Sequence, residues 1–514
     1  MFKKIISIAL SIATLASLAT ITTTAETQEF TKNSYDFTQN LTVGFNIGNT
    51  FDSAINSPDE TAWGCPKVKE GLIQSIKDKG FDTIRLPVTW CGAMSKDENG
   101  YFTGDFKDNE VFINRVKEVV DWIYSRDMYC IINTHHEMSW LRTWWPVKGS
   151  TTTEDTARTE AMYKAFDKLW TNIANKFKDY GERLIFEGYN ETRSAENGWS
   201  SIDDDQVAIT KIAQTYVDAV RATGGNNAVR YLMVSTYAAG LGNEAKKFKM
   251  PNDDANHLIL SVHSYAPHSF CFPGSQKEFK QSDLDKEFDS DFQFLRKEYL
   301  SKGTGVILGE MGAGDKDNDD ERVKYAHAII AKCAEHGIIP VVWDNNKFYN
   351  PDENVEMFGL VHRNAPFEWY EDKVATAYVS KAKELRNSRP TAETFAAEAS
   401  TTTTTTTTTK TSTTTTTTTQ PTTFPTTTTT QKTTTTTITP TTNTTTTTTT
   451  QNTYQKGDVS RDGLINSFDI MLLKQALVDT QLQSGIMDVA DVSEDNKLNS
   501  FDIMLIKKLI LESK

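Results

Sequence analysis

The chain has 514 residues, a formal net charge of -14 and five cysteines at scattered positions. This length exceeds one ordinary domain, so we expect one large core with appended segments. The acidic balance excludes a protein that grips a nucleic-acid backbone through clustered basic residues, and the absence of CxxC spacing excludes a typical structural zinc site. A single disulfide stays open.

Residues 1–25 form a short apolar run behind Lys3 and Lys4, and small residues follow at Thr23 and Ala25. This order is typical of a signal peptide with its cleavage site. A membrane anchor is the alternative, but Ser and Thr interrupt the run and no second hydrophobic span follows. We therefore expect an exported, extracellular protein without a membrane span.

The large domain, expected at residues 30–388, alternates short β-branched and apolar runs with longer amphipathic stretches, which is the pattern of βα units. Eight strands with helices between them predict an α/β fold, the closed (β/α)8 TIM barrel. The predicted strands are Leu41–Asn46, Asp82–Pro87, Met128–Thr134, Arg183–Tyr189, Arg230–Ser235, His257–His263, Gly305–Glu310 and Ile338–Trp343. The predicted helices include Val111–Arg126, Glu160–Tyr180, Asp205–Thr223, Leu284–Leu300 and Glu321–His336.

The segment from Thr401 to Thr450 is almost pure Thr, with a few Pro, Gln and Lys. It has too few apolar side chains to offset the loss of conformational entropy on folding. We expect residues 389–453 to be a disordered linker, with O-glycosylation an open question. This linker separates the barrel from a small domain at residues 454–514.

The small domain repeats one unit, DVSRDGLINSFDIMLLKQAL from Asp458 and DVSEDNKLNSFDIMLIKKLI from Asp491. Each unit begins with a twelve-residue loop and continues as an amphipathic helix, so the module should be all-α. Oxygen ligands at loop positions 1, 3, 5 and 12, and a backbone carbonyl at position 7, suit Ca²⁺. The expected ligands of two ions are Asp458, Ser460, Asp462, Leu464 and Asp469, and Asp491, Ser493, Asp495, Lys497 and Asp502.

Polar side chains begin where the apolar runs of the barrel strands end. Such a side chain alone is more often a structural hydrogen-bonding group, but repetition at six strand ends indicates a catalytic site, because barrel enzymes react at this face. The residues are Arg85, His135, His136, Asn190, Glu191, His263, Tyr265, Glu310 and Trp343.

Two of these side chains are acids, Glu191 after the fourth strand and Glu310 at the end of the seventh. Most carboxylates lie on the surface in ion pairs, but acids directly after buried barrel strands can face the central cavity. Two carboxyl groups in one cavity are what cleavage of a glycosidic bond requires. One protonates the leaving oxygen, and the other attacks the anomeric carbon or activates water.

Nine segments, in order across the large domain, resemble glycoside hydrolase family 5, and most closely its bacterial cellulase branch, subfamily 4. The segments are GFNIGNTFD, TAWG, TIRLPVTW, IINTHHE, FEGYNETR, TGGNNAVRYLMVSTYAA, LSVHSYAP, VILGEMG and PVVWDN. The resemblance implies a secreted endo-β-1,4-glucanase that hydrolyses cellulose and related plant β-glucans without a catalytic cofactor. We expect the catalytic domain to be monomeric.

The resemblance also implies roles for the two acids. Glu191 looks like the acid/base and Glu310 like the nucleophile of a retaining double displacement, with carboxyl groups about 5 to 5.5 Å apart. Arg85 and Tyr265 would donate hydrogen bonds to Glu310 and keep it ionised. Thr192 follows Glu191 where the family usually has Pro, which affects the stiffness of the loop more than the chemistry.

The sugar contacts implied by the resemblance come from the remaining strand ends. Asn190 would bind the 2-hydroxyl, His263 would contact Glu191, and Trp343 would form the aromatic floor. His135 or His136 would bind the 3-hydroxyl; neighbouring strand residues point to opposite faces, so we expect only one in the pocket. A metal site at His135, His136 and Glu137 is the rival interpretation, but no third ligand is evident.

Several tryptophans lie in the predicted loops after the strands, where flat rings can stack on pyranose faces. Some of them would instead pack the loops, and we expect about half to contact sugar. The set is Trp63, Trp140, Trp144, Trp145 and Trp199.

The duplicated loop-helix units after a Thr/Pro linker resemble a type I dockerin, which implies binding to a cohesin module on a cellulosome scaffold. The pairs Ser467-Phe468 and Ser500-Phe501 correspond to the positions that read the partner. A plain structural calcium module is the alternative for this domain. For the barrel, the alternatives are a xyloglucanase, xylanase or mannanase, or a non-catalytic carbohydrate-binding barrel.

Overall fold

The computed structural model describes residues 30–107, 110–146, 152–274 and 276–398, together with 455–460, 465, 469–470, 472–473 and 486–512. The expected signal peptide and the whole Thr-rich segment, Thr401 to Thr450, therefore lie outside the described residues. The chain divides into two compact units, residues 1–413 and 414–514. Within the described parts, none of the helices combines the length and the apolar character needed to span a membrane.

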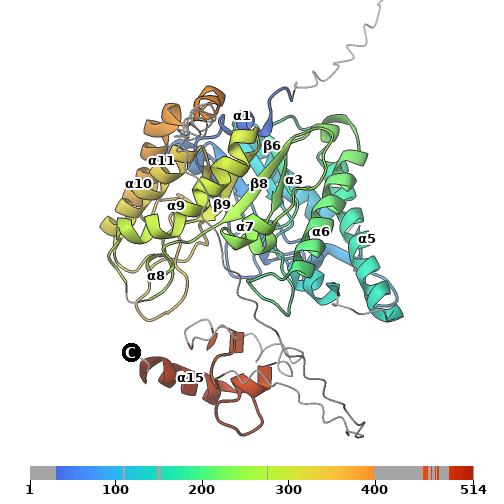
Figure 1. The fold of residues 1–514 in the computed structure, drawn as a ribbon, viewed down its shortest axis with the longest axis vertical. Coiled ribbons are helices and arrows are strands. Elements are labelled where there is room, and N and C mark those ends of the chain that lie inside the picture. Colours follow the sequence, from blue (N-terminus) through green and yellow to red (C-terminus); the bar gives the residue numbers. More distant parts are fainter. Residues whose placement is uncertain are drawn as a thin grey trace, which may run out of the picture. The chain divides into compact units, whose positions relative to one another are not determined.

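Eight parallel strands close into a barrel surrounded by helices, which confirms the predicted α/β class (Figure 1). The order around the barrel is β1, β10, β9, β8, β7, β6, β5 and β2, and β1 pairs with both β10 and β2. The strands are β1 (Gly44–Asn46), β2 (Thr83–Leu86), β5 (Tyr129–Asn133), β6 (Leu184–Glu187), β7 (Leu232–Ser235), β8 (Leu258–His263), β9 (Gly305–Met311) and β10 (Ile339–Val342).

The helices that follow the strands form the outer ring of the barrel, with α5 and α6 packed side by side (Figure 1). Observed α5 begins before the predicted Glu160, because the Thr152 side chain accepts the backbone N–H of Asp155 and caps the helix. The helices of this unit are α1 (Ser34–Thr38), α2 (Glu70–Lys79), α3 (Val111–Tyr124), α4 (Met138–Leu141), α5 (Thr153–Lys176), α6 (Asp203–Ala222), α7 (Asn243–Lys247), α8 (His268–Cys271), α9 (Gln281–Glu298), α10 (Asp319–His336) and α11 (Asp372–Leu385).

Two apolar clusters result from the alternation of side chains along the strands. In β5, Cys130 and Ile132 belong to the large cluster between sheet and helices, whereas Ile131 belongs to a smaller cluster of strand residues inside the barrel. The N-terminal segment joins the inner cluster through Phe37, whose ring stacks on Tyr231 at 3.6 Å. This segment therefore covers one end of the barrel interior. The polar residues of the strands lie at the other end.

An antiparallel hairpin of β3 (Met94–Lys96) and β4 (Phe102–Phe106) is inserted after β2 and packs on α5. The sequence analysis did not predict it. All five cysteines are buried and free, so the structure holds no disulfide between them.

The packed part of this unit continues beyond the expected boundary at residue 388. Residues 392–398 are helical, and Phe395 packs into the large core with its ring against Tyr35. Arg389 donates to the backbone carbonyls of Leu41 and Thr42. The residues expected to begin the linker therefore belong to the barrel, as far as residue 398.

The C-terminal unit contains α15 (Ser500–Glu512) and a small apolar cluster. Of the expected calcium ligands, Asp462 and Leu464 lie outside the described residues, as does the Ser467-Phe468 pair. The fully buried members of the cluster are Val459, Leu473, Ala490 and Ile506.

Candidate active site

The two acids expected to carry the chemistry meet at one end of the barrel. Glu310 is the penultimate residue of β9, and Glu191 lies in the loop after β6. The Nδ1 atom of His263, the last residue of β8, lies 3.1 Å from Glu191 Oε1 and 3.7 Å from Glu310 Oε1. One oxygen of each acid and the His263 nitrogen all lie within 4.8 Å of one another. A register shift between Val262 and His263 pairs His263 with Glu310 and sets this approach.

Arg85 of β2 connects the polar residues at this end of the barrel. Its Nη1 donates to Glu310 Oε1 at 2.8 Å and to Asn46 Oδ1 at 2.9 Å, and its Nη2 donates to Asn190 Oδ1 at 2.8 Å. Its Nε donates to Glu187 Oε2 at 2.7 Å. Burial opposes the charge of Arg85, but the neighbouring carboxylates of Glu187 and Glu310 outweigh this effect and raise its pKa. The guanidinium is therefore a permanent cation.

Tyr265 supplies the second donor to Glu310, from its hydroxyl to Oε2 at 2.9 Å. Burial, and then the negative charges of Glu310 and Glu191, raise the pKa of Tyr265 well above its usual value. The hydroxyl consequently stays protonated and remains a donor throughout the working pH range.

Burial and charge act in opposite directions on Glu191. Burial favours the neutral acid, but the hydrogen bond and the electrostatic effect of His263, followed by the charge of Arg193, lower the pKa of Glu191 overall. Arg193 Nη1 lies 3.9 Å from the Glu191 carboxylate, and its guanidinium lies over the Trp199 ring at 3.6 Å.

His135 and His136 lie beyond the end of β5, so strand alternation does not apply to them, and both face the site. The expectation that one would be packed away was wrong. Their rings are 4.5 Å apart; His135 lies parallel to Trp343 at 6.0 Å, and His136 lies 5.4 Å from Trp63. Burial lowers the pKa of both rings, that of His136 to about 4, so both are neutral hydrogen-bonding groups.

For the rival metal interpretation, the structure offers a third candidate ligand that the sequence did not indicate, Asp52. Asp52 brings a carboxylate oxygen within 4.8 Å of a nitrogen of each histidine. However, both Asp52 oxygens accept backbone N–H groups, from Asn49 at 2.8 Å and Thr50 at 2.6 Å. Glu137, the acid that the rival interpretation grouped with the two histidines, accepts the backbone N–H groups of Trp90 and Cys91 in the loop after β2. Both acids therefore have structural partners.

Four of the five candidate loop tryptophans separate into two kinds, and the side chain of Trp144 lies outside the described part of the structure. Trp140 and Trp145 are buried and pack the loops, with the Trp145 indole donating to Asp205. Trp63 and Trp199 are 41% and 43% exposed and are available to a ligand. Trp343 is mostly buried, with its ring against Gly48.

Glu187, Ser261 and Asn133 form part of the site that the sequence analysis missed. Glu187 accepts hydrogen bonds from Ser261 Oγ at 2.7 Å and Asn133 Nδ2 at 3.1 Å, in addition to Arg85. All of them are fully buried. The available signal was the position of Glu187 in an otherwise apolar strand, LIFE, where a charged side chain needs a partner.

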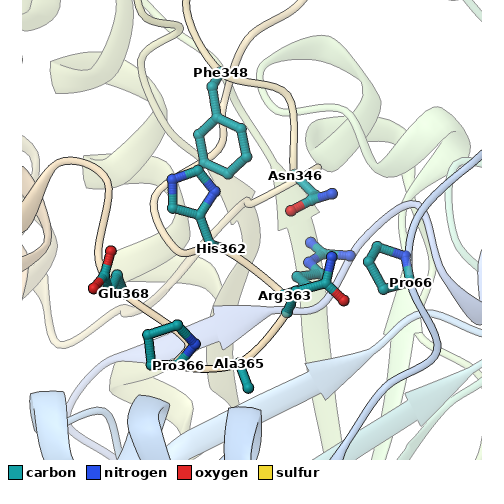
Figure 2. Close-up of a pocket in the computed structure, with 9 residues that line it drawn as sticks. Pro66, Asn346, Phe348, His362, Arg363, Ala365, Pro366 and Glu368 are labelled. Atoms are coloured by element: carbon teal, nitrogen blue, oxygen red, sulfur yellow. The ribbon is translucent and has the colours of Figure 1, made fainter.

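An open pocket of about 280 Å³ lies between Pro66 and the loop after β10 (Figure 2). Phe348 and His362 stand ring to ring at one side, with Asn346 and Glu368 as polar groups around it. Arg363, which lines the pocket, is buried and donates hydrogen bonds to the carbonyl and the carboxylate of Asp344. The pocket thus adjoins the segment that carries Trp343.

The described calcium-ligand candidates come together in pairs. Ser460 donates its backbone N–H to Asp469 at 2.8 Å and its hydroxyl to Asp458 at 3.3 Å. The second loop repeats this arrangement: Ser493 donates to Asp502 at 3.0 Å and to Asp491 at 3.1 Å. All four carboxylates are almost fully buried.

The second loop also accommodates its departure from the usual glycine. Asn496 has φ 61, a left-handed conformation that Asn tolerates, as expected. Its N–H donates to Asp491 at 2.8 Å, and Lys497 donates to Asp495 at 2.9 Å.

A closed (β/α)8 barrel with two adjacent carboxyl groups at one end, a buried arginine and exposed indoles defines the class of a glycoside-cleaving hydrolase. The comparisons with known proteins agree. The family model described as Cellulase (glycosyl hydrolase family 5) matches residues 42–349, and that of the Dockerin type I domain matches residues 456–511. The chain belongs to glycosyl hydrolase family 5 and carries a type I dockerin domain.

Relatives and solved structures each match about two thirds of the chain. Endoglucanase A of Ruminococcus albus is 35% identical over 353 residues, which is 67% of this chain and 91% of that protein. A GH5-4 broad specificity endoglucanase from Ruminococcus champanellensis with bound cellotriose has 34% identity and a TM-score of 0.60, covering 68% and 98% of the two chains. A xyloglucan-specific endo-β-1,4-glucanase from a metagenomic library has 31% identity, a TM-score of 0.60 and coverages of 68% and 98%.

Proposed function

We propose that the barrel is an endo-β-1,4-glucanase that hydrolyses cellulose and related plant β-glucans with retention of configuration. The observation that carries this proposal is the approach of Glu191 and Glu310, with one oxygen of each within 4.8 Å. An inverting enzyme separates its carboxyl groups by about 6.5 to 9.5 Å to hold a water between them. The shorter approach favours direct attack by one acid on the sugar.

In the first step, Glu310 attacks the anomeric carbon and Glu191 gives its proton to the departing glycosidic oxygen. The glycosyl-enzyme bond forms as the glycosidic bond breaks. Glu310 then carries no charge, so a like charge no longer opposes ionisation of Glu191, and Glu191 becomes a base. In the second step Glu191 takes a proton from water, whose oxygen attacks the same carbon and releases Glu310.

The surrounding residues prepare these two steps. Arg85 and Tyr265 keep Glu310 ionised and fix the direction of attack, and His263 holds Glu191. Asn190, itself oriented by Arg85, would contact the 2-hydroxyl, where a hydrogen bond strengthens in the transition state.

The aromatic and imidazole groups would bind the sugars themselves. His135 and His136 are both close enough to the site to bind a hydroxyl, and their neutral state suits either donation or acceptance. Trp343 would form the floor below the sugar being cleaved, and exposed Trp63 would stack on its neighbour.

The reaction is tested by trapping its covalent intermediate. A 2,4-dinitrophenyl 2-deoxy-2-fluoro-β-cellobioside should add one fluorocellobiosyl mass to the full chain, on the peptide that contains Glu310. Glu310→Ala should lose at least about a thousandfold of activity on carboxymethylcellulose and take up no label. Exposed Glu118→Ala is the matched control and should behave as wild type. Label on another residue would contradict the proposed nucleophile, and equal inactivity of wild type and Glu310→Ala would indicate a binding barrel.

The choice of polysaccharide is a second question for the same barrel, because xyloglucanase, xylanase and mannanase activities use the same two acids. We favour unbranched β-1,4-glucan because several of the relatives are named endoglucanases. Hydrolysis rates on purified cellulose derivatives, xyloglucan, xylan and mannan identify the preferred polysaccharide. A rate on xyloglucan far above the others would contradict the preference for unbranched glucan.

We further propose that the C-terminal domain binds two calcium ions and docks the secreted enzyme to a cohesin module of an extracellular scaffold. Four buried carboxylates arranged in two pairs fit this, because such pairs repel each other until a cation neutralises them. The ions would be held by Asp458, Ser460, Asp462, Leu464 and Asp469, and by Asp491, Ser493, Asp495, Lys497 and Asp502.

A further inference from the structure

Glu187 is a buried acid to which neither the reaction nor the sugar contacts assign a part. It is the last residue of β6 and is fully buried inside the barrel. Its carboxylate accepts three hydrogen bonds, from Arg85, Asn133 and Ser261. Replacing a buried ion pair by apolar residues is often neutral or stabilising, so stability alone does not explain its charge.

The key geometric fact is that Arg85 forms ion pairs with two carboxylates at once. Its Nε lies 2.7 Å from Glu187 and its Nη1 2.8 Å from Glu310. One positive charge is therefore divided between two negative charges, and the two carboxylate side chains are 0% and 7% exposed. The group Glu187, Arg85 and Glu310 has a net charge of about minus one, and it would have none without the charge of Glu187.

We propose that Glu187 is a positioning residue for hydrolysis: it holds the Arg85 guanidinium in place and offsets its charge, so that Glu310 stays nucleophilic. This inference rests on the proposed role of Glu310 as nucleophile. A transition state with oxocarbenium character carries positive charge next to Glu310, and a fully available Arg85 cation would oppose it. Glu187 removes that opposition without touching the sugar.

The other charged and titratable groups that face Glu310 come from different elements. His263 and Tyr265 approach from β8 and the loop after it, and Glu191 from the loop after β6. Glu356, in the loop after β10, faces both acids: burial first, then the charges of Glu191 and Glu310, raise its pKa. Glu187 differs from all of these because it acts on Glu310 only through Arg85.

The decisive variant is Glu187→Gln, which keeps the shape and can keep the hydrogen bonds. The amide oxygen can accept from Arg85 and Asn133, while the amide nitrogen donates to Ser261, whose hydroxyl is able to accept. Only the charge is lost. We expect kcat to fall about tenfold to a hundredfold with little change in KM, because the loss appears in the transition state. The acid limb of the pH profile of kcat/KM should move to lower pH, because protonating Glu310 beside an undivided Arg85 cation is harder.

Glu187→Asp tests whether charge or shape matters. It retains the charge on a shorter side chain, so the acid limb should return toward the wild-type position even where kcat stays reduced. Glu244→Gln is the matched control: Glu244 of α7 is another buried acid, bonded to Ser201 in the loop before α6 and to Gln206 of α6. Its substitution should leave the pH profile unchanged.

Ser261→Ala provides a second test that does not depend on the folding of Glu187→Gln. The substitution removes one hydrogen-bond donor from Glu187, so the negative charge of Glu187 acts more strongly on Arg85. The acid limb of the pH profile of kcat/KM should then move slightly to higher pH, opposite to the shift expected for Glu187→Gln. An unchanged acid limb in both folded variants would overturn the inference. The fluorocellobioside separates the two failures: a wild-type label absent from Glu310 overturns the proposed function, whereas a label on Glu310 with unmoved pH profiles overturns only the role of Glu187.

Discussion

At the scale of single residues, the environment of Glu310 depends on donors that come from distant parts of the chain. Arg85 reaches one oxygen and Tyr265 the other, at 2.8 and 2.9 Å. The pKa of each donor is raised, so Arg85 stays charged and Tyr265 stays protonated. The proposed nucleophile is thus held by hydrogen bonds to both of its oxygens.

Tyr265→Phe removes one of these donors and should move the acid limb of kcat/KM to higher pH, because the Glu310 carboxylate loses a stabilising hydrogen bond. We expect kcat to fall about tenfold to a hundredfold. Rates on an aryl cellobioside between pH 4 and 8 provide the measurement. Tyr216→Phe is the matched control, because its buried hydroxyl donates only to the Phe186 carbonyl. An acid limb that stays in place in Tyr265→Phe would show that the phenol does not act on Glu310.

At the scale of elements, the loops after β2 and β5 are joined through one buried carboxylate. Glu137 Oε1 accepts the backbone N–H groups of Trp90 at 2.5 Å and Cys91 at 3.0 Å, while Oε2 has no hydrogen-bond partner in the described part of the chain. Burial raises the pKa of Glu137 to about 8, although the backbone N–H groups act to lower it. This acid directly follows His135 and His136, so it fixes the loop that presents them.

Glu137→Gln should therefore change the pH dependence of stability. Between its ordinary pKa of 4.5 and about 8, folded Glu137 retains a proton that the unfolded chain releases, so stability falls as pH rises through this window. The neutral amide does not titrate and can still accept from the loop. The melting temperature of the variant minus that of wild type should increase from pH 5 to pH 8.5. A constant difference would mean that Glu137 is ionised in the fold at all of these pH values.

The segment after residue 388 offers a second test at this scale, because Phe395 packs into the core and contacts Tyr35. Phe395→Ala should lower the free energy of unfolding of the barrel by about 3 kcal/mol, the usual cost of removing a buried aromatic ring. Thermal unfolding of the full chain measures this, with exposed Thr394→Ala as a neighbouring control. Equal melting temperatures would show that the segment contributes no stability.

At the scale of the whole molecule, the two units are expected to depend differently on calcium. The barrel has its own large apolar core, whereas the described residues of the C-terminal unit form a small apolar cluster beside paired buried acids. A domain with so small a core needs the free energy of metal binding to fold. Metal removal should therefore act on one unit and spare the other.

Chelation of calcium from the full chain should unfold the C-terminal unit and abolish binding to a cohesin, while hydrolysis of carboxymethylcellulose changes little. Heteronuclear NMR or circular dichroism reports the first effect, and reducing-sugar release the second. Adding back Ca²⁺ should restore binding, and Asp491→Asn with Asp502→Asn should weaken that recovery. Loss of hydrolysis on chelation would instead point to a metal site in the barrel.

The class of fold follows from the pattern along the chain, because eight apolar runs with helical patterns between them leave few alternatives to a closed barrel, and each run marks where a strand ends. The same pattern indicated Glu191, Glu310 and Arg85, since charged residues at the ends of buried strands must meet at one face. Local pattern carries this information because it depends on neighbours along the chain.

How those residues interact became visible only in the folded chain. The approach of the two acids depends on a register shift between β8 and β9, the shared use of Arg85 by Glu187 and Glu310 depends on strands far apart in sequence, and both histidines face the site because β5 ends before them. These are contacts across a closed sheet, and their distances follow from packing and register. The physical reason is that a strand pattern specifies which face a side chain occupies, but not which neighbour it meets there.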